Sequence, residues 1–320
     1  MHTIAAPFMG FFDRYKASLK PREVEEPIDY WLHRPLAYVV ARASLPLPIS
    51  PNFVTLVSIA LGLAAAACLL REFAGHLQVA GALIFASAVL DCADGQLARM
   101  RGTSSPFGRM LDGCADLIVT SAIAPATVYV IWRKHGTPQW LGLTVVALCV
   151  VTMVTSSFHT GMYDHFKNVW LRFTTPSFKE GEDSASATRR WREAAPTGLS
   201  AFAWRVYLFY VKSQEDYVAK FDPNTIAAIG SLPPYSPENE ATYRKYAERP
   251  WAWLRALFGF GSLMFGLALF NALEIPDVYL VVRLVVLNAI FFGYVRPLQR
   301  RASRDALAEI AARDARAAAG

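Results

Sequence analysis

The chain has 320 residues, of which 54% are hydrophobic and 18% are charged, and its mean hydropathy is +0.26. Soluble globular domains contain about 25% charged residues, so this composition argues against a soluble domain and indicates an integral membrane protein. The net charge of +6 lies mostly outside the apolar stretches. We therefore expect the lipid bilayer to be the large partner, and we expect no nucleic-acid partner.

Residues 1–48 form an N-terminal segment that precedes the apolar stretches. They lack the long apolar region and the cleavage site of a signal peptide. Within them, Ile28–Leu47 mixes aromatic and aliphatic residues with His33, Arg34 and Arg42 and ends among prolines. This pattern predicts an amphipathic helix on the membrane surface, with an ordinary packed helix as the alternative.

Six stretches are apolar and come close to the roughly 20 residues that a helix needs to cross the hydrocarbon core. They are Pro51–Leu70, Gly75–Met100, Gly108–Trp132, Trp140–Tyr163, Trp251–Ala272 and Val278–Val295. The first four fall in a segment of residues 49–163 and the last two in residues 250–297. We therefore predict an all-α integral membrane protein with six transmembrane helices.

Lysine and arginine residues predict the orientation of these spans. Only Arg71, Arg133 and Lys134 lie in the three short loops of one side, whereas the other side carries many basic residues. The positive-inside rule places the basic side in the cytoplasm. Both termini and the loop after the second span are then cytoplasmic.

The remaining polar regions are predicted to be cytoplasmic as well. Residues 164–249 form an insert in which Leu199–Val211 is a candidate for a short membrane-surface helix, and residues 298–320 form a tail. The cysteines lie in or beside apolar segments without metal-site spacing, so we interpret them as reduced packing residues. They are Cys68, Cys92, Cys114 and Cys149.

Four aspartates stand out in this apolar chain. Asp91 and Asp94 are three residues apart on the second span, and Asp112 and Asp116 are four residues apart on the third. Each pair therefore shares one helix face. Because the intervening loop is short, we expect the two helices to be antiparallel neighbours whose aspartates meet near the cytoplasmic surface.

Such a cluster needs compensation, because two like charges about 4 Å apart repel by several kcal/mol at a surface-like effective dielectric. Protonation or a bound cation can relieve the repulsion. An all-oxygen site suits Mg²⁺, Mn²⁺ or Ca²⁺, and no histidine or cysteine has zinc-site spacing. Small residues at Gly95, Ala98 and Gly108 leave room for a ligand or for close helix packing.

A cation transporter or channel, and a structural scaffold, are alternative readings of the same carboxylates. Transport would require an acidic pathway across the bilayer. Outside the cytoplasmic aspartates, the predicted spans contain no carboxylate, and Arg283 and Asn288 are their conspicuous polar residues. The distribution of acidic residues therefore argues against transport.

The spacing D-x-x-D-G-x-x-A-R-x8-G-x3-D-x3-D, from Asp91 to Asp116, resembles the signature of the CDP-alcohol phosphotransferase family of membrane enzymes. The resemblance covers about residues 49–163. It implies transfer of a substituted phosphoryl group from a CDP-linked donor to an alcohol acceptor, with release of CMP, in phospholipid synthesis. It also implies homodimers, for which Gly259–Gly266 offers small residues.

The resemblance also assigns residue roles. It implies one or two Mg²⁺ or Mn²⁺ ions on Asp91, Asp94 and Asp112, and Asp116 as the general base that also touches a second metal. The CDP part of the donor would lie against Asp91, Asp94, Gly95, Ala98, Arg99 and Gly108. Asn52, in a Pro-Asn-x-x-Thr start of the first span that also resembles the family, is a further donor contact, although Pro-Asn is equally a helix-entry pattern.

The acceptor site is the least marked in the sequence. His159, Tyr163 and Lys167 follow one another at one-turn spacing, and Arg255 begins the fifth span. They are our candidates for acceptor binding, with membrane anchoring of the basic residues as the alternative. Family members with phosphorylated sugar acceptors are expected to have a lysine near residue 160. His159 and Thr160 occupy that place, which argues against such an acceptor.

Overall fold

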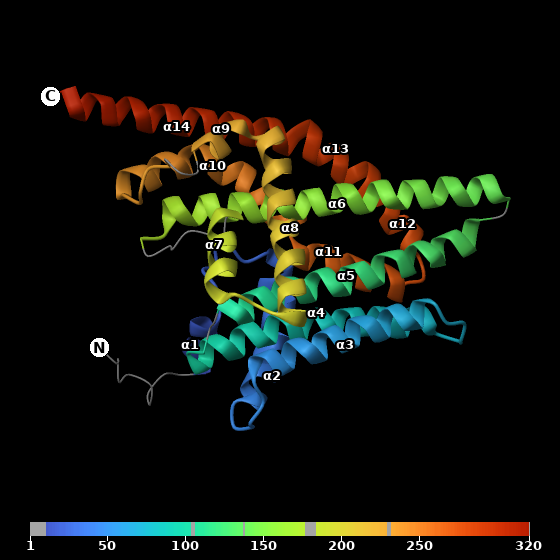
Figure 1. The fold of residues 1–320 in the computed structure, drawn as a ribbon. Coiled ribbons are helices and arrows are strands. Elements are labelled where there is room, and N and C mark those ends of the chain that lie inside the picture. The colour runs from blue at the N-terminus through green and yellow to red at the C-terminus, as the bar shows by residue number, and fades with distance from the viewer. Residues whose placement is uncertain (1–10, 104–105, 137, 177–183, 229–231, 320) are drawn as a thin grey trace. The chain divides into compact units, whose positions relative to one another are not determined.

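The computed structural model describes residues 11–103, 106–136, 138–176, 184–228 and 232–319, and the regular structure in these ranges is entirely helical (Figure 1). Six helical stretches in them are long and apolar enough to cross a membrane. They are Pro51–Leu69, His76–Arg101, Leu111–His135, Gln139–Thr174, Pro237–Ala272 and Pro276–Ala317. The predicted all-α class with six spans is thus confirmed.

The last three of these stretches extend well beyond the predicted spans. Helix α6 (Gln139–Thr174) has 36 residues, or about 54 Å at 1.5 Å per residue, against about 30 Å of hydrocarbon. The ends that we predicted for the insert, at residues 164 and 249, therefore lie inside helices. Hydropathy indicates which part of a helix lies in the lipid. The helix itself can continue beyond the lipid where its residues pack against other helices.

The N-terminal segment forms helix α1 (Phe11–Ser18), a π-helical turn η1 (Asp29–His33) and helix α2 (Arg34–Ser44). One face of α2 packs on helix α4 (His76–Arg101) through an apolar cluster that includes Ala37 and Ala41. Trp31 and Val39 are exposed by 72% and 62%. Helical structure therefore covers most of this stretch, and an amphipathic helix on a membrane surface stays a prediction.

By its internal contacts the chain divides into two compact units. The first unit consists of Met1–Val130 and Met264–Pro276. It contains α3 (Pro51–Leu69), α4, most of α5 (Pro106–His135) and most of α11 (Phe260–Ala272). The second unit, Ile131–Leu263 and Asp277–Gly320, contains α6 and the helices of the insert.

Small residues pack the first unit closely. Ser58 of α3 and Ser87 of α4 exchange hydrogen bonds, each hydroxyl donating to the other residue's carbonyl oxygen at 2.9 and 2.8 Å. A Cβ atom on Gly81 would lie 2.5 Å from the Ala268 carbonyl oxygen of α11. Only glycine allows so close an approach of two helices at this position.

Aromatic side chains pack the second unit. Tyr163 of α6 stacks on Trp251 of α10 (Pro237–Leu257) with ring centroids 5.6 Å apart, and Phe173 of α6 stacks on Tyr243 at 4.4 Å. Lys245 of α10 forms an ion pair of 2.8 Å with Glu309 of α14 (Arg296–Ala319). The long helices α6, α10 and α14 are thus held together beyond the predicted spans.

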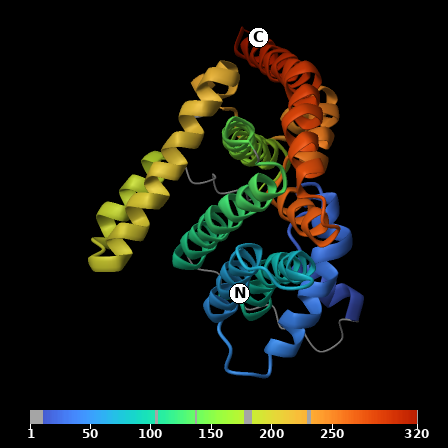
Figure 2. The same cartoon turned by 90° about the vertical axis from the view of Figure 1, so that its right-hand side faces the viewer.

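The insert forms α7 (Ser184–Ala194), α8 (Gly198–Phe221) and α9 (Pro223–Ala228). Helix α8 has 24 residues, well beyond the predicted Leu199–Val211, and it runs across α6 rather than alongside it (Figures 1 and 2). The last helical run combines α12 (Pro276–Val281), η3 (Val282–Leu287), α13 (Asn288–Ile290), η4 (Phe291–Val295) and α14. It carries the predicted tail as a continuous helix.

Candidate active site

Three of the four motif aspartates come together in the first unit. Asp91 and Asp94 on α4 and Asp112 on α5 each offer a carboxylate oxygen, and these three oxygens lie within 4.8 Å of one another. Asp116, half-buried one turn further along α5, acts electrostatically on Asp91, as do Asp112 and Asp94. The two aspartate pairs therefore form one group, as their spacing predicts.

The group is graded from buried to exposed. Asp94 is only 5% exposed, Asp91 is half-buried and Asp112 is exposed. A ligand can thus reach the group from the side of Asp112. We call Asp91, Asp94, Asp112 and Asp116 the aspartate group.

Thr55 lies at the aspartate group, although the sequence analysis did not select it as a site residue. Its hydroxyl donates a hydrogen bond to the Asp94 carboxylate, and Thr55 itself is 3% exposed. Asn52 lies half-buried one turn before Thr55, in the first turn of α3 that Ser50 caps by accepting from the Phe53 amide at 3.2 Å. The Pro-Asn-x-x-Thr start of the first span contained the signal for this contact.

The small residues of the motif lie half-buried on the same two helices as the aspartates. A Cβ atom on Gly95 would meet only the Arg99 guanidinium, at 3.4 Å, so the surface at Gly95 is open. Ala98 on α4 and Gly108 on α5 are also half-buried. Their role in nucleotide binding stays a prediction.

Arg99 holds the end of α1. Its Nε atom donates to the Ser18 carbonyl oxygen at 2.6 Å, and Gln96 Nε2 donates to the Ser18 hydroxyl at 3.2 Å. The motif arginine therefore fastens the N-terminal segment to α4. Nothing in the sequence pattern paired Ser18 with Arg99, which lies 81 residues away.

A second contact of the N-terminal segment is made by Arg34. Its guanidinium, which is buried, donates to Glu25 Oε2 at 3.1 Å and to the Cys92 carbonyl oxygen at 3.2 Å. Burial alone lowers the pKa of Arg34, but the nearby Glu25 and Asp29 carboxylates outweigh this effect and hold the pKa above its usual value. Arg34 therefore stays charged next to Cys92, the residue that follows Asp91 in α4.

Asp29, His33 and Cys92 also place one potential ligand atom each within 4.8 Å of one another. His33 Nδ1 and Asp29 Oδ1 are already 2.7 Å apart, as a hydrogen-bonded pair. The charged Arg34 beside Cys92 disfavours a cation there. The four cysteines are free, in keeping with their prediction as reduced packing residues.

The aspartate group has the chemistry of a divalent-cation site. Its donors are carboxylate oxygens from two helices, and mutual repulsion makes them costly to assemble without positive charge. Hard cations such as Mg²⁺ and Mn²⁺ prefer such oxygen ligands. The residues present therefore fit the predicted metal.

The comparisons with known proteins agree with this geometry. The family model described as CDP-alcohol phosphatidyltransferase matches residues 48–212, just over half of the chain, including the whole aspartate group. The chain belongs to the CDP-alcohol phosphatidyltransferase family. The match extends beyond residue 163, where we expected the resemblance to end, into helix α8 of the insert.

Individual relatives are similar over about a third of this chain. The phosphatidylinositol phosphate synthase of Corynebacterium glutamicum is 36% identical over 117 residues, 37% of this chain and 51% of that protein. The synthase of the same name from Mycobacteroides abscessus is 31% identical over 122 residues, 38% of this chain and 50% of that protein. The CDP-diacylglycerol–serine O-phosphatidyltransferase of Mycobacterium leprae is 35% identical over 112 residues, 35% of this chain and 36% of that protein. The chain thus spans about half or less of these relatives' lengths.

The acceptor candidates of this phosphatidyltransferase-family chain all lie in the second unit, on α6 and α10. Lys167 lies over the Tyr163 ring, 5.1 Å from its centroid, and pairs with Asp164. His159 is fully buried and packs its ring against Phe258 and Phe291, at 4.8 and 4.7 Å. Arg255 is half-buried on α10. Burial among aromatic rings favours a packing role for His159.

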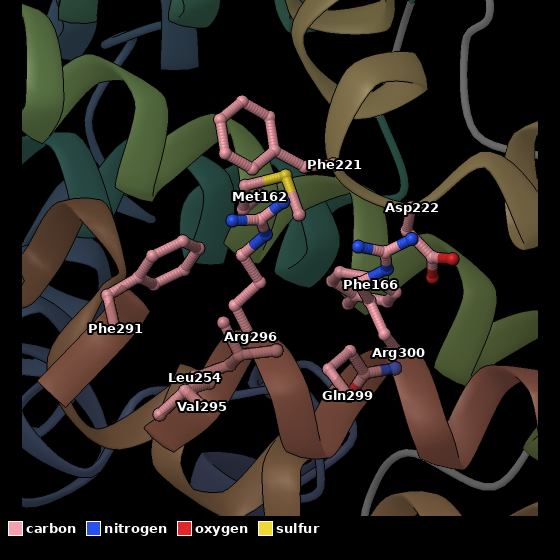
Figure 3. Close-up of a pocket in the computed structure, with 10 residues that line it drawn as sticks. All are labelled: Met162, Phe166, Phe221, Asp222, Leu254, Phe291, Val295, Arg296, Gln299 and Arg300. Carbon is pink, nitrogen blue, oxygen red and sulfur yellow. The ribbon is translucent and has the colours of Figure 1, made fainter. Parts of the chain in front are cut away.

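The second unit also contains a small pocket that our candidates missed; it opens to solvent, and its roughly 220 Å³ of unfilled space includes open solvent. It is lined by Met162, Phe166, Phe221, Asp222, Leu254, Phe291, Val295, Arg296, Gln299 and Arg300 (Figure 3). Arg296 and Arg300 extend from one helix toward it, and the Arg296 guanidinium lies 4.6 Å from the Phe221 ring centroid. Asp222 accepts hydrogen bonds from Thr225 and Ser303 at 3.0 and 2.8 Å. The pocket therefore combines apolar side chains with two guanidinium groups and the Asp222 carboxylate.

Proposed function

We propose that this chain is a divalent-metal-dependent enzyme that transfers a phosphatidyl group from CDP-diacylglycerol to an alcohol and releases CMP. The observation that carries the proposal is the convergence of Asp91, Asp94 and Asp112 within 4.8 Å inside the region that matches the phosphatidyltransferase family. A relative named CDP-diacylglycerol–serine O-phosphatidyltransferase suggests the donor class. A cation transporter, our alternative, has no such support.

We assign the metal to Asp91, Asp94 and Asp112, with Asp116 as a further ligand for a second ion. Bound Mg²⁺ or Mn²⁺ would offset the charge of the donor's diphosphate and stabilise the departing CMP. The carboxylates hold the site in place from two helices. The Thr55 hydroxyl, by donating to Asp94, fixes the most buried of them.

Asp116 is assigned as the general base that takes the proton of the acceptor hydroxyl. A base must reach that hydroxyl within hydrogen-bond distance. Asp116 lies one turn beyond Asp112 along α5, so it can face the acceptor while Asp112 faces the metal. The CDP part of the donor is assigned to Asn52, Gly95, Ala98, Arg99 and Gly108, together with Asp91 and Asp94.

We propose a phosphorylated polar alcohol as the acceptor, with serine as the second candidate. Two relatives are named phosphatidylinositol phosphate synthase, and one is named for serine. No lysine lies near residue 160, but Arg296 and Arg300 supply guanidinium groups that suit phosphate, and this favours the first class. Tyr163, Lys167 and Arg255 also remain candidates for acceptor binding.

We also propose a multi-pass membrane protein with both termini and the active site in the cytoplasm, because the basic residues lie on that side. A homodimer is proposed from the family resemblance. Gly261 and Gly266 are already buried within the chain, so a dimer contact through this stretch would need adjoining residues.

One assay tests the enzyme proposal. Purified protein in detergent is given CDP-diacylglycerol, CDP-choline or CDP-ethanolamine, each with inositol phosphate, glycerol phosphate or serine, with and without EDTA. We expect CMP release only with CDP-diacylglycerol and only without EDTA. Absence of CMP release from every combination would defeat the enzyme proposal.

The acceptor class has its own test. Arg296→Gln and Arg300→Gln should raise the KM for a phosphorylated acceptor and leave the KM for CDP-diacylglycerol unchanged. An unchanged acceptor KM in both variants would remove the pocket from the acceptor assignment and would favour serine.

A further inference from the structure

Helix α8 of the insert has two unlike faces. Trp204, Val211 and Val218, spaced seven residues apart, are buried at 8%, 7% and 2% exposure. On the opposite face, Phe202 and Phe209 are exposed by 64% and 75%. The buried face already packs within the second unit, so the exposed phenylalanines belong to a separate surface.

Basic residues alternate with these two phenylalanines. Arg205 and Lys212 are both exposed and lie about one turn after Phe202 and Phe209. Positions 202, 205, 209 and 212 follow the spacing of a single helix face. We call these four residues the α8 stripe.

The α8 stripe is unfavourable in water. Covering a phenylalanine side chain is favourable relative to leaving it exposed to water. Large aromatic residues with basic neighbours are instead typical of helices that lie in a membrane interface. There, rings enter the acyl boundary while Lys and Arg extend their charges to the headgroups.

The direction of α8 suits such an interface. Helix α8 runs across the membrane-length helix α6 in both views (Figures 1 and 2). Its end packs on Phe158 of α6, where Phe158 and Phe221 have ring centroids 4.3 Å apart. A helix that crosses a spanning helix in this way lies along the membrane plane.

The position along α6 at which α8 packs also fits a location in the membrane interface. Trp140, at the start of α6, is 68% exposed, as expected for an aromatic residue at one membrane boundary. Phe158 follows 18 residues later, or about 27 Å along the helix. The hydrocarbon core is about 30 Å thick, so α8 packs on α6 near the opposite boundary.

We propose that α8 lies in the membrane interface and that the α8 stripe binds anionic phospholipids. Phe202 and Phe209 enter the acyl boundary, and Arg205 and Lys212 contact lipid phosphates. A second copy of this chain is the less suitable occupant, because lysine is depleted in the cores of protein interfaces. This proposal is independent of the proposed enzymatic reaction.

Photo-crosslinking of the full-length chain tests the location. Benzoylphenylalanine replaces Phe202 or Phe209 in protein reconstituted into nanodiscs of phosphatidylcholine with a minor fraction of phosphatidylglycerol. The control position is the exposed Arg304 of α14, about 42 Å along the helical run from Pro276. We expect lipid adducts by mass spectrometry at 202 and 209 and none at 304.

Two results would overturn the location: no lipid adduct at either stripe position, or chain-to-chain adducts in place of lipid adducts. The second result would assign the stripe to a homodimer. Size-exclusion profiles of the labelled proteins show whether each variant is folded.

Charge recognition is tested with Arg205→Gln combined with Lys212→Gln. A basic residue near an anionic membrane surface changes lipid binding about fivefold. The share of phosphatidylglycerol among adducts at 209, expressed as its ratio to phosphatidylcholine, should therefore fall at least about fivefold. Arg301→Gln combined with Arg316→Gln removes the same charge from exposed positions of α14 and should leave that share unchanged. An equal share in the stripe variant would refute anionic-lipid recognition.

Discussion

The two units are stabilised by different kinds of contact. In the first unit, small and hydroxyl residues bring helix backbones together, as at Gly81 and the Ser58–Ser87 pair. In the second unit, large rings stack between long helices, as for Tyr163 on Trp251. Close backbone contact fixes side-chain positions sharply, and the first unit contains the aspartate group. The difference indicates that the first unit is the less tolerant of change.

The largest effect is expected from Asp112→Asn and Asp116→Asn, which separate metal binding from proton transfer. A general base contributes about 10²–10⁴-fold to a rate, so Asp116→Asn should lose that factor in CMP release. It should still bind Mn²⁺ and the CDP donor, as measured by calorimetry. Asp112→Asn should lose Mn²⁺ binding as well.

Substantial CMP release by Asp116→Asn would remove the base assignment. Equal loss of Mn²⁺ binding in both variants would instead indicate that Asp116 contributes to metal binding as much as Asp112 does. Either result would change how the four aspartates divide their roles, and neither would alter their proximity.

Arg34→Met should give the largest loss of stability, because it leaves Glu25 buried without its partner. Removing one member of a buried ion pair costs about 3–5 kcal/mol. The midpoint of thermal unfolding in detergent should therefore fall clearly. The double variant Glu25→Gln with Arg34→Met should be less destabilised than the single one, since both charges are then gone. A double variant as unstable as the single one would contradict the ion-pair explanation.

The aspartate group was predictable because helix geometry alone determines it. Spacings of three and four residues put each pair on one face, and a short loop brought the pairs together. The contacts of Ser18 with Arg99 and of Arg34 with the Cys92 carbonyl were not predictable. They join residues far apart in sequence, and their acceptors include backbone carbonyl groups, which every residue has.

The second unit shows the limits of hydropathy. Six apolar stretches predicted six spans, but α6 continues from Tyr163 to Thr174 and buries Trp170 and Phe173 there. Polar residues such as Asp164 and Lys167, which precede these two rings, ended the apolar pattern without ending the helix. The pocket at Arg296 and Arg300 was missed for the same reason, because it is formed by helices that continue past the predicted boundaries.

A smaller difference is expected between Gly81→Ala and Gly293→Ala. The added methyl group at Gly81 would meet the Ala268 carbonyl oxygen of α11 at 2.5 Å, whereas a Cβ on Gly293 meets nothing within 4 Å. Overpacking costs about 1–3 kcal/mol, so Gly81→Ala should lower the unfolding midpoint. Gly293→Ala, within a helical run, should leave it unchanged or raise it. Equal effects of the two substitutions would contradict the contrast in packing between the units.

The smallest effect is expected from His159→Phe in the second unit. The ring lies among Phe258 and Phe291, with the Asn288 side chain also near it, and its nitrogens form no well-formed hydrogen bond within the described residues. A phenyl ring of similar shape should therefore change stability by less than about 1.5 kcal/mol. The KM for the acceptor should stay unchanged if the histidine only packs. A severalfold rise in that KM, with stability retained, would return His159 to the acceptor site as a binding residue.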